Sequence, residues 1–366
     1  MISGKATLEG TKGFAARSSA GKGHFRHVTA RLFLSSIGLG TYLGAEDTAT
    51  DEGYEACVRL ALECGINVFD SAVNYRGQRS ERAIGRAIEG AVAAGEVRRD
   101  EVFVSTKGGY LPHDAEDPRP PRQYILETFV ESGIAPKDAL VAGGHCMAPG
   151  YLRDQIARSR RNLGLETIDL YYLHNIESQR AALDKAAFRK RLTAAAEVLE
   201  AAADAEEIGT WGLATWDGLR VPPEHPEHIS VNEVVEVARE IAGDKHHFCA
   251  VQLPFNLAMP QAMGYASQLT GQGKVTVLRA AQSLGLSVFG SATLLQGRLA
   301  EELPEEVNEA FPEVSTPAQR AIQFSRSAPG MTVSLVGVST PAHARDDFSL
   351  SETPPAPPAR VMGLFE

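Results

Sequence analysis

The feature that most constrains the fold is an alternation of short, apolar, β-branched runs with segments whose apolar residues recur at helical spacing. Helical spacing is clear from Tyr151 to Leu163 and in the segment that begins at Ser80. Eight strands alternating with helices indicate parallel βα units, which right-handed crossovers can close into a barrel. The sequence therefore predicts an α/β fold, a single-domain (β/α)8 TIM barrel with long βα loops. The predicted strands lie near Ile37–Leu39, Ile66–Phe69, Val102–Ser105, Ile168–Leu173, Thr210–Ala214, Ala250–Leu253, Leu286–Phe289 and Val333–Val338.

The barrel is expected over residues 31–350, between two shorter segments. Residues 1–30 are rich in Gly, Ser and Lys and are expected to form a tail or a small hairpin over one end of the barrel. Residues 351–366, with several prolines, are expected to form an extended C-terminal tail. One loop is unusually long, an insertion at about residues 108–150 that includes a helical pattern from Tyr124 to Glu131. Because loops after strands build the mouth of such a barrel, we expect this insertion to act as a lid or to select the substrate.

Composition excludes several classes of function. A net charge of -10 provides no basic surface for nucleic acid or for anionic lipid. No stretch approaches the ~20 consecutive apolar residues of a membrane span, and the first residues do not resemble a signal peptide. The cysteines lack metal-ligand spacing, so we expect no metal and a reducing, cytoplasmic environment. The expected partner is a small molecule, and the oligomeric state is not specified. The cysteines are Cys57, Cys64, Cys146 and Cys249.

Four residues with proton chemistry stand at or just beyond strand ends, where side chains enter the mouth of a barrel. Asp70, Lys107 and His174 end the second, third and fourth predicted strands, and Tyr75 lies five residues beyond Asp70. Reducing a carbonyl requires a proton for the developing alkoxide, and a tyrosine of pKa ~10 releases it reluctantly. We expect Lys107 to lower the pKa of Tyr75 and Asp70 to hold the lysine charged. His174 is expected to orient the substrate oxygen or to share its proton.

Taken singly, each of these residues has an ordinary structural explanation. An Asp at a strand end often caps the next helix, and a lone Lys is usually a surface charge or part of an ion pair. Their joint occurrence, in order and at strand ends, favours catalysis instead. His145-Cys146-Met147 in the insertion has no second ligand at metal spacing, so we expect it to have a structural role or to form part of the substrate wall.

These segments resemble the aldo-keto reductase family. Gly65–Ala72, followed by Tyr75, Ser80-Glu81 and Gly85, is similar to the family signature around its catalytic aspartate and tyrosine. Lys107 matches the family's lysine strand, Arg161–His174 resembles the segment that ends at its catalytic histidine, and Gly38–Thr41 resembles its first strand. The resemblance runs from about residue 33 to 348. It implies an NAD(P)(H)-dependent oxidoreductase that interconverts an alcohol with an aldehyde, ketone or keto-sugar, with Tyr75 as the general acid/base.

The resemblance also implies an extended nicotinamide dinucleotide across the strand ends, without a GxGxxG motif. Thr215 replaces the family's Asn beside the carboxamide, and Gly290 falls where a tyrosine stacks on the ring. Thr340 or His343 replaces the Lys or Arg that binds the 2′-phosphate, and Asp347 replaces the Asn at the adenine. NADP(H) is the family default, but these replacements leave NAD(H) open. The implied cofactor residues are Gly40, Thr41, Thr215, Gln252, Ser291, Gly297, Arg298, Gly337, Ser339, Thr340, His343 and Asp347.

Two other functions stay open on the sequence alone. Lys107 could form a Schiff base in a barrel lyase or aldolase, although the adjacent Asp70 and Tyr75 speak against it. Alternatively, the chain could be a cofactor-sensing barrel subunit with little turnover, as are barrel relatives attached to potassium channels. The replacements at the cofactor positions are compatible with that second alternative.

Overall fold

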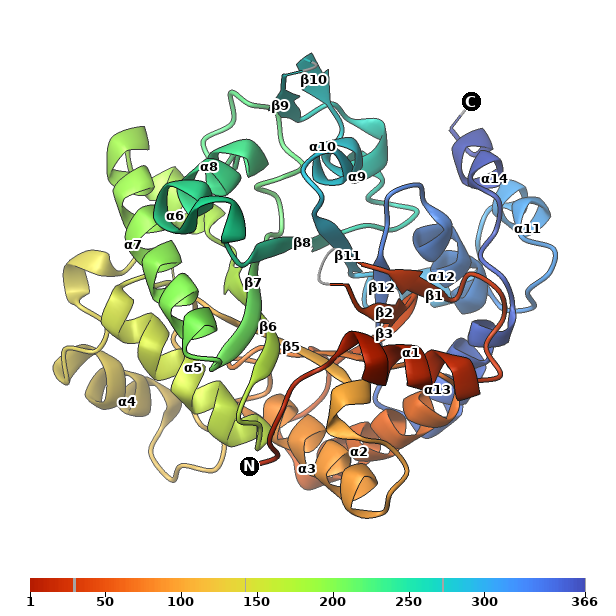
Figure 1. The fold of residues 1–366 in the computed structure, drawn as a ribbon, viewed down its shortest axis with the longest axis horizontal. Coiled ribbons are helices and arrows are strands. Elements are labelled where there is room, and N and C mark those ends of the chain that lie inside the picture. The colour runs from red at the N-terminus through yellow and green to blue at the C-terminus, as the bar shows by residue number, and fades with distance from the viewer. Residues whose placement is uncertain (29–30, 142, 272, 366) are drawn as a thin grey trace.

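The computed structural model describes residues 1–28, 31–141, 143–271 and 273–365. Eight parallel strands close into a barrel, in the order β11-β12-β3-β4-β5-β6-β7-β8 (Figure 1). This confirms the predicted (β/α)8 fold. The strands are β3 (Ile37–Gly40), β4 (Val68–Asp70), β5 (Phe103–Gly108), β6 (Ile168–His174), β7 (Ile208–Ala214), β8 (Phe248–Pro254), β11 (Ser287–Ser291) and β12 (Val333–Gly337).

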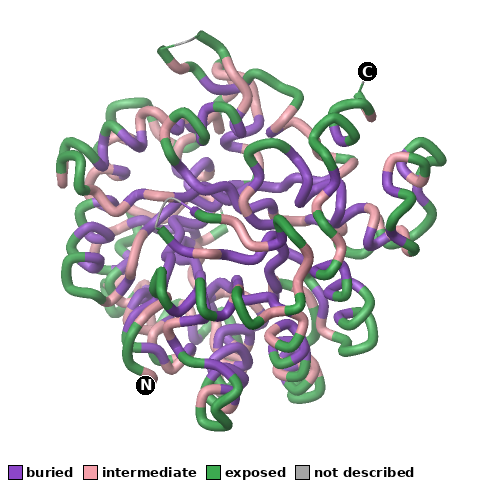
Figure 2. The backbone as a smooth tube through the Cα atoms, turned by 45° about the vertical axis from the view of Figure 1, so that its right-hand side comes forward, coloured by how far each residue is buried: buried purple, intermediate pink, exposed green. Residues whose placement is uncertain are grey.

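The barrel strands are buried because helices surround them, as parallel sheets require (Figure 2). Side-chain caps begin several of these helices: Asp47 accepts from the Thr50 amide and Ser230 from the Glu233 amide. The surrounding helices are α2 (Thr48–Glu63), α3 (Arg79–Ala93), α5 (Pro149–Leu163), α7 (Lys185–Asp204), α8 (Val231–Ala242), α10 (Val277–Ser283), α12 (Pro317–Ser327) and α13 (Pro341–Ser349).

The N-terminal segment covers the amino end of the barrel. Strand β1 (Phe25–His27) pairs antiparallel with β2 (Phe33–Ser35), which leads directly into β3. Leu32 and Leu34 from this hairpin cluster with barrel residues such as Phe103, so they close that end of the core. The segment also contains α1 (Leu8–Arg17), a helix that the sequence pattern does not predict. Thr7 caps α1, and Phe14 is the residue that joins it to the main core.

The loops contain shorter elements. In the insertion, α4 (Pro121–Ile125) and the π-helix η2 (Leu126–Glu131) form the predicted helical pattern, and η3 (Lys137–Ala139) follows. The C-terminal tail is extended only over residues 354–357, because a helix starts at Pro358 and buries Val361. The remaining elements are η1 (Arg99–Glu101), α6 (Glu177–Ala182), η4 (Gly243–Lys245), α9 (Gln261–Gly264), the hairpin of β9 (Gln268–Thr270) and β10 (Gly273–Val275), η5 (Arg298–Ala300), α11 (Glu305–Ala310), η6 (Leu350–Glu352) and α14 (Pro358–Gly363).

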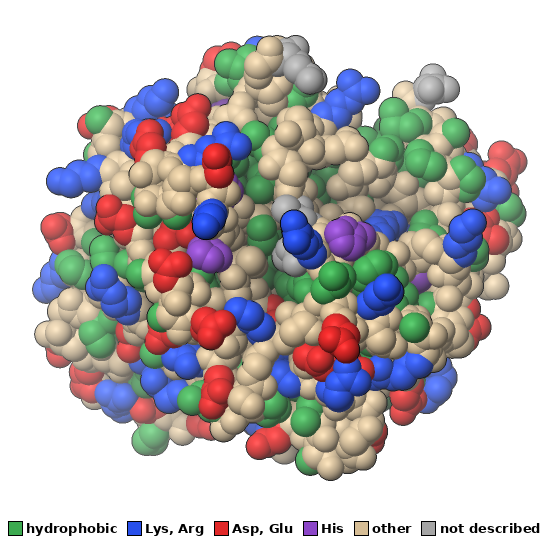
Figure 3. Space-filling view, in the orientation of Figure 1, with side chains coloured by type: hydrophobic (Ala, Val, Ile, Leu, Met, Phe, Trp, Pro, Cys, Tyr) green, Lys and Arg blue, Asp and Glu red, His purple; other side chains and the backbone are tan. Residues whose placement is uncertain are grey.

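The surface carries charges of both signs. On the face shown in Figure 3, Lys and Arg side chains alternate with Asp and Glu side chains, and neither sign dominates a large area. Within the described residues, no helix is both long enough and apolar enough to cross a membrane. The same residues contain no group of His, Cys, Asp or Glu side chains that could hold a metal ion.

Gly85 belongs to the motif that follows Tyr75. A glycine is needed at this position because α3 packs closely against the end of α5. A Cβ at this position would lie 2.6 Å from the Leu163 carbonyl oxygen. We expect Gly85→Ala to lower the free energy of unfolding by roughly 1–3 kcal/mol, as overpacking does. Gly90→Ala in the same helix is the matched control: its Cβ would meet only the flexible end of Arg59, and Ala favours the helix. Denaturant unfolding checks the prediction, which fails if Gly85→Ala is as stable as Gly90→Ala.

Candidate active site

A cavity of about 420 Å³ opens at the carboxyl ends of the barrel strands. The strand register explains why distant residues meet there: Gly40 pairs with Asp70, and Ala214 pairs with both His174 and Gln252. The residues predicted from the sequence that line this cavity are Gly40, Thr41, Asp70, Tyr75, His174, Thr215, Gln252, Ser291, Gly297 and Gly337.

Asp70 and Lys107 form a buried ion pair beside this cavity. The Lys107 Nζ lies 2.5 Å from Asp70 Oδ2 and 2.7 Å from the Ser71 carbonyl oxygen. The other carboxylate oxygen of Asp70 accepts hydrogen bonds from Ser105 Oγ at 2.7 Å and from Gln252 Nε2 at 2.9 Å. Burial, the largest single cause, would lower the pKa of Lys107, but Asp70 and Tyr75 together raise it by more, so that the net shift of this pKa is upward. The lysine is therefore a fixed cation.

Tyr75 lies next to this ion pair, and the Lys107 Nζ is 4.8 Å from the centroid of its ring. Burial raises the pKa of the Tyr75 hydroxyl, and the nearby Lys107 charge opposes this rise. The pKa of the Tyr75 hydroxyl is therefore raised overall. Lys107 lowers this pKa, as expected from the sequence, but burial raises it by more, so the lysine offsets only part of the cost of burying a phenolate.

His174 faces the same cavity as a neutral imidazole. Its ring centroid lies 5.9 Å from that of Tyr75 and 5.4 Å from that of Tyr110. Burial and the charge of Lys107 hold the pKa of His174 well below its ordinary value. A protonated His174 is thus excluded near neutral pH, and the residue can orient a polar ligand without adding a charge.

The cavity also shows features that suit a dinucleotide. The Thr215 Oγ1 is buried and has no hydrogen-bond partner among the described residues, so it is available to a ligand amide. The loop after β11 has left-handed φ at Ala292, Leu295, Gln296 and Gly297. Backbone turns of this kind form concave sites for anions such as phosphates. The residues present therefore fit a nicotinamide dinucleotide.

Five of the expected cofactor residues are not part of the cavity lining. Thr340 and His343 are exposed, and the Thr340 hydroxyl lies 3.2 Å from His343 Nδ1. Asp347 is buried in α13, and burial, together with Asp346, raises its pKa to about 7. Arg298 is exposed at the start of η5, and Ser339 lies just after β12.

Gly290 is not the position from which a ring could cover the cavity. A Cβ built there would lie 3.1 Å from Met331 Sδ and 3.4 Å from Ser325 Oγ, outside the cavity. The next residue, Ser291, lines the cavity instead. Because side chains alternate along a strand, a shift of one residue moves the expected position to the opposite face of the barrel wall.

Several cavity residues that were not predicted from the sequence directly neighbour those that were. Asn74 precedes Tyr75, Asn175 follows His174, and Trp216 follows Thr215, so adjacency to a predicted strand end is the signal that would have found them. Tyr110 could have been found in the same way, because it lies two residues beyond the end of β5. Outside the loop after β11, the additional lining residues are Tyr42, Leu43, Asn74, Tyr110, Asn175, Ala214, Trp216 and Leu335. That loop, which the family resemblance places at the diphosphate, also lines the cavity with Ala292, Thr293, Leu294 and Gln296.

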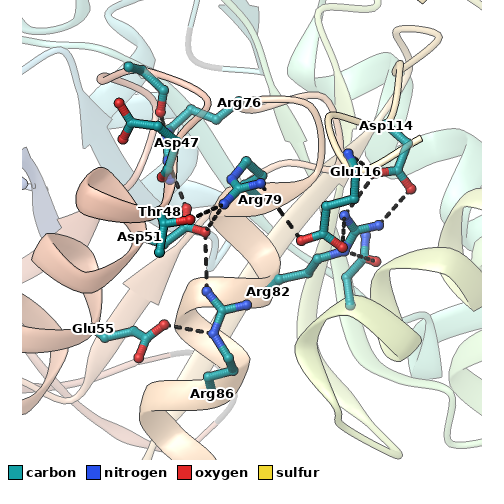
Figure 4. A network of polar contacts seen from close by, with 12 residues as sticks. Asp47, Thr48, Asp51, Glu55, Arg76, Arg79, Arg82, Arg86, Asp114 and Glu116 are labelled. Atoms are coloured by element: carbon teal, nitrogen blue, oxygen red, sulfur yellow. Dashed lines mark hydrogen bonds and ion pairs between the residues drawn. The ribbon is translucent and has the colours of Figure 1, made fainter. Parts of the chain in front are cut away.

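A charged network fixes the loops around this cavity (Figure 4). Asp51 of α2 accepts from Arg76 at 2.7 Å and from Arg79 at 2.8 Å, and Arg76 directly follows Tyr75. Arg82 of α3 makes a two-pronged contact with Asp114 in the long insertion, at 2.8 and 2.7 Å. Two-pronged Arg–carboxylate pairs restrict orientation as well as distance. The network thus ties the loop of Tyr75 and the insertion to the same two helices.

The structure defines a (β/α)8 barrel with a Tyr, Lys, Asp and His cluster at its mouth. The model of the aldo/keto reductase family matches residues 36–358. The chain belongs to the aldo-keto reductase family.

Two curated proteins and one solved structure are similar to this chain. NADH-specific methylglyoxal reductase of Escherichia coli is 28% identical over 151 residues, which is 40% of this chain and 40% of that protein. This chain thus spans about two fifths of that relative's length. A putative voltage-gated potassium channel subunit beta of Schizosaccharomyces pombe is 22% identical over 335 residues, covering 85% of this chain and 82% of that protein. An aldo/keto reductase from Klebsiella pneumoniae, solved with NADP and acetate, aligns with a TM-score of 0.62 and 18% identity, covering 94% and 95% of the two chains.

Proposed function

We propose that this protein is an NAD(P)(H)-dependent oxidoreductase that interconverts a small-molecule carbonyl and the corresponding alcohol. The observation that carries this proposal is the buried Asp70–Lys107 pair beside Tyr75, next to a neutral His174, at a cavity of ligand size. The proposal is tested by following loss of the reduced nicotinamide absorbance with a panel of aldehydes, ketones and keto-sugars. Absence of turnover with every carbonyl would refute it.

In this mechanism Tyr75 is the general acid for reduction. Burial keeps the hydroxyl protonated near neutral pH, and Lys107 stabilises the tyrosinate that forms when the proton leaves. Asp70 holds Lys107 in position, and neutral His174 orients the carbonyl oxygen. A bound nicotinamide supplies the hydride. In the oxidation direction the same Tyr75 accepts the proton from the alcohol.

Residues at the ends of β7 and β8 and in the loop after β11 would hold the cofactor. Thr215 and Gln252 would contact the carboxamide, and Ser291 through Gly297 would hold the diphosphate. The exposed Thr340 and His343 provide no fixed cation for a 2′-phosphate, so we propose that NADH serves as well as NADPH. One relative is an NADH-specific reductase by name, which is compatible with this proposal.

The four free cysteines would suit a reducing compartment such as the cytoplasm.

The choice of dinucleotide gives a specific prediction. We expect comparable Kd values for NADH and NADPH in fluorescence titrations of the natural protein. His343→Arg should tighten NADPH binding by at least about tenfold, since a charge-assisted contact contributes about 1.5–3 kcal/mol, and should leave NADH unchanged. His343→Gln, which changes the side chain without adding charge, is the control and should affect neither. A hundredfold preference of the natural protein for NADPH would contradict the prediction.

A second candidate, a cofactor-sensing subunit with little turnover, is favoured by the likeness to the putative channel subunit over most of both chains. Tight cofactor binding without turnover would support a cofactor-sensing role.

The Schiff-base alternative is weaker in this structure. Lys107 is almost fully buried, does not line the cavity and is held protonated by Asp70, whereas a Schiff base needs a free amine. Failure of borohydride to trap a carbonyl compound on Lys107 would exclude it.

A further inference from the structure

His145 is a fully buried histidine in the insertion, outside the cavity lining. Its Nε2 lies 2.6 Å from the backbone carbonyl oxygen of His174, at the end of β6. The insertion also bridges back to its own start, since Tyr110 and His145 form an antiparallel bridge. A buried polar side chain from a loop is therefore bonded to the main chain of the residue that orients the substrate.

The tautomer of His145 follows from its neighbours. The Gln179 Oε1 accepts from Arg191 Nη1 at 2.5 Å, and because a guanidinium only donates, this contact fixes which end of the amide is oxygen. The Gln179 Nε2 then faces His145 Nδ1 at 3.1 Å and donates to it. His145 Nδ1 is thus an acceptor, and the ring proton must be on Nε2. That proton is donated to the His174 carbonyl.

The surroundings of this hydrogen bond leave little room for movement. A Cβ at Gly109 would lie 2.6 Å from the His174 carbonyl oxygen and 2.8 Å from His145 Nε2, so only glycine fits beside the bond. The Tyr110 ring lies edge-on to both histidines, with centroids 5.2 and 5.4 Å away. Burial lowers the pKa of His145 to about 4, and its bond to His174 only partly opposes this. The imidazole therefore stays neutral near neutral pH.

We propose that His145 is a positioning residue for the active site: its Nε2–H, held by Gln179 and Arg191, fixes the end of β6 so that His174 and Tyr110 face the substrate. This inference rests on the proposed function, because it uses the role of His174 in orienting the carbonyl. It assigns the insertion a part in catalysis that is separate from contact with the substrate. Thr215 and Gln252 have supports of their own, since the Thr215 amide donates to the Gln252 carbonyl and Gln252 Nε2 donates to Asp70, so we expect cofactor binding to persist without this bond.

The test compares two buried histidines with the same bonding pattern. His145→Phe removes both polar atoms, whereas His145→Gln retains a donor for the His174 carbonyl. The control is His24→Phe at the amino end of the barrel, where His24 Nε2 lies 3.1 Å from the Gly65 carbonyl and Nδ1 lies 3.2 Å from Ser36 Oγ. Both Phe variants should lose stability, since both leave a buried carbonyl without its partner.

Only the His145 variants should change catalysis. We expect His145→Phe to lower kcat by about ten- to hundredfold, with the Kd for NADPH unchanged, because small displacements of an orienting group have effects of this size. His145→Gln should recover most of the loss, and His24→Phe should keep its kcat. Equal kcat losses in both Phe variants, or no loss in His145→Phe, would overturn the proposal.

A second measurement is independent of turnover. In spectra of protein labelled with ¹⁵N-histidine, His145 should show the Nε2–H tautomer, and Gln179→Leu should retain it, because the His174 carbonyl opposite Nε2 can only accept a hydrogen bond. A His145 that carries its proton on Nδ1 in the natural protein would refute the inference. Gln179→Leu also provides a kinetic test if His145→Phe does not fold. Absence of turnover in the natural protein would instead refute the proposed function.

Discussion

Tyr75→Phe is expected to lower the rate of carbonyl reduction by about 10²–10⁴-fold, the range that a positioned general acid contributes. The change removes only the hydroxyl, so the contacts of the ring with Tyr42, His174 and Lys107 persist. We therefore expect an unchanged Kd for the dinucleotide and unchanged thermal stability. Steady-state kinetics and fluorescence titration on the same preparation measure both quantities. An unchanged reduction rate would refute the role assigned to Tyr75.

The matched control for this prediction is Tyr110→Phe, because Tyr110 is a second phenol that lines the same cavity. Its hydroxyl accepts a bond from Asn175 at 3.3 Å and has no lysine beside its ring among the cation contacts described. Loss of the Tyr110 hydroxyl should affect KM more than kcat.

The pH dependence of reduction is a further test of the role of Tyr75. Since burial raises the pKa of Tyr75 from its ordinary value, reduction by the natural protein should be flat through neutral pH and decline only at alkaline pH, as the acid loses its proton.

Lys107→Met is expected to have the largest effect on stability, about 3–5 kcal/mol in the free energy of unfolding. The substitution leaves the Asp70 carboxylate buried without its cation, with only the Ser105 and Gln252 side chains as donors. It should also abolish most of the activity, because no charge then stabilises the tyrosinate. Denaturant unfolding and steady-state kinetics measure the two effects separately.

The double variant Asp70→Asn/Lys107→Met distinguishes stability from catalysis. Removing both charges should recover most of the stability lost in Lys107→Met, because no unpaired charge stays buried. Activity should stay low, since Tyr75 still has no cation nearby. Additive stability losses in the double variant would show that the ion pair does not couple the two residues. Recovery of activity with stability would show that Lys107 acts only through folding.

Much of the fold could be predicted because its signals are local. Each barrel strand lies at or within a few residues of its predicted run, and the helical spacing from Tyr151 to Leu163 corresponds to α5. Helix α1 was harder to predict, because it buries few residues and depends on the Thr7 cap and on contacts with η1. Helix α14 begins at Pro358, and the prolines around it favoured an extended tail in the sequence-based prediction, although proline is favourable in a first helical turn.

The candidate site was predictable where it depended on the order of residues along the chain. Asp70 and Tyr75 lie at or just after the end of β4 and His174 ends β6, and parallel strands necessarily bring their carboxyl ends to one mouth. Whether a position such as Gly290 faces the cavity depends on the face of the strand, and a one-residue difference reverses that face. The five expected cofactor residues outside the cavity lining stay a prediction for binding experiments.

By itself, then, the sequence determined the barrel, the family and the residues that stand at its mouth, because hydrophobic periodicity and strand order are properties of the chain. Only the tertiary structure decided the protonation states and supports of those residues. Burial sets the direction of the Tyr75 and His174 pKa values, and it depends on the surrounding chain. The bond from His145 to His174 joins residues 29 positions apart, in a geometry that no local pattern encodes. Electrostatic and hydrogen-bond energies depend on distance in space, which exists only once the barrel has closed.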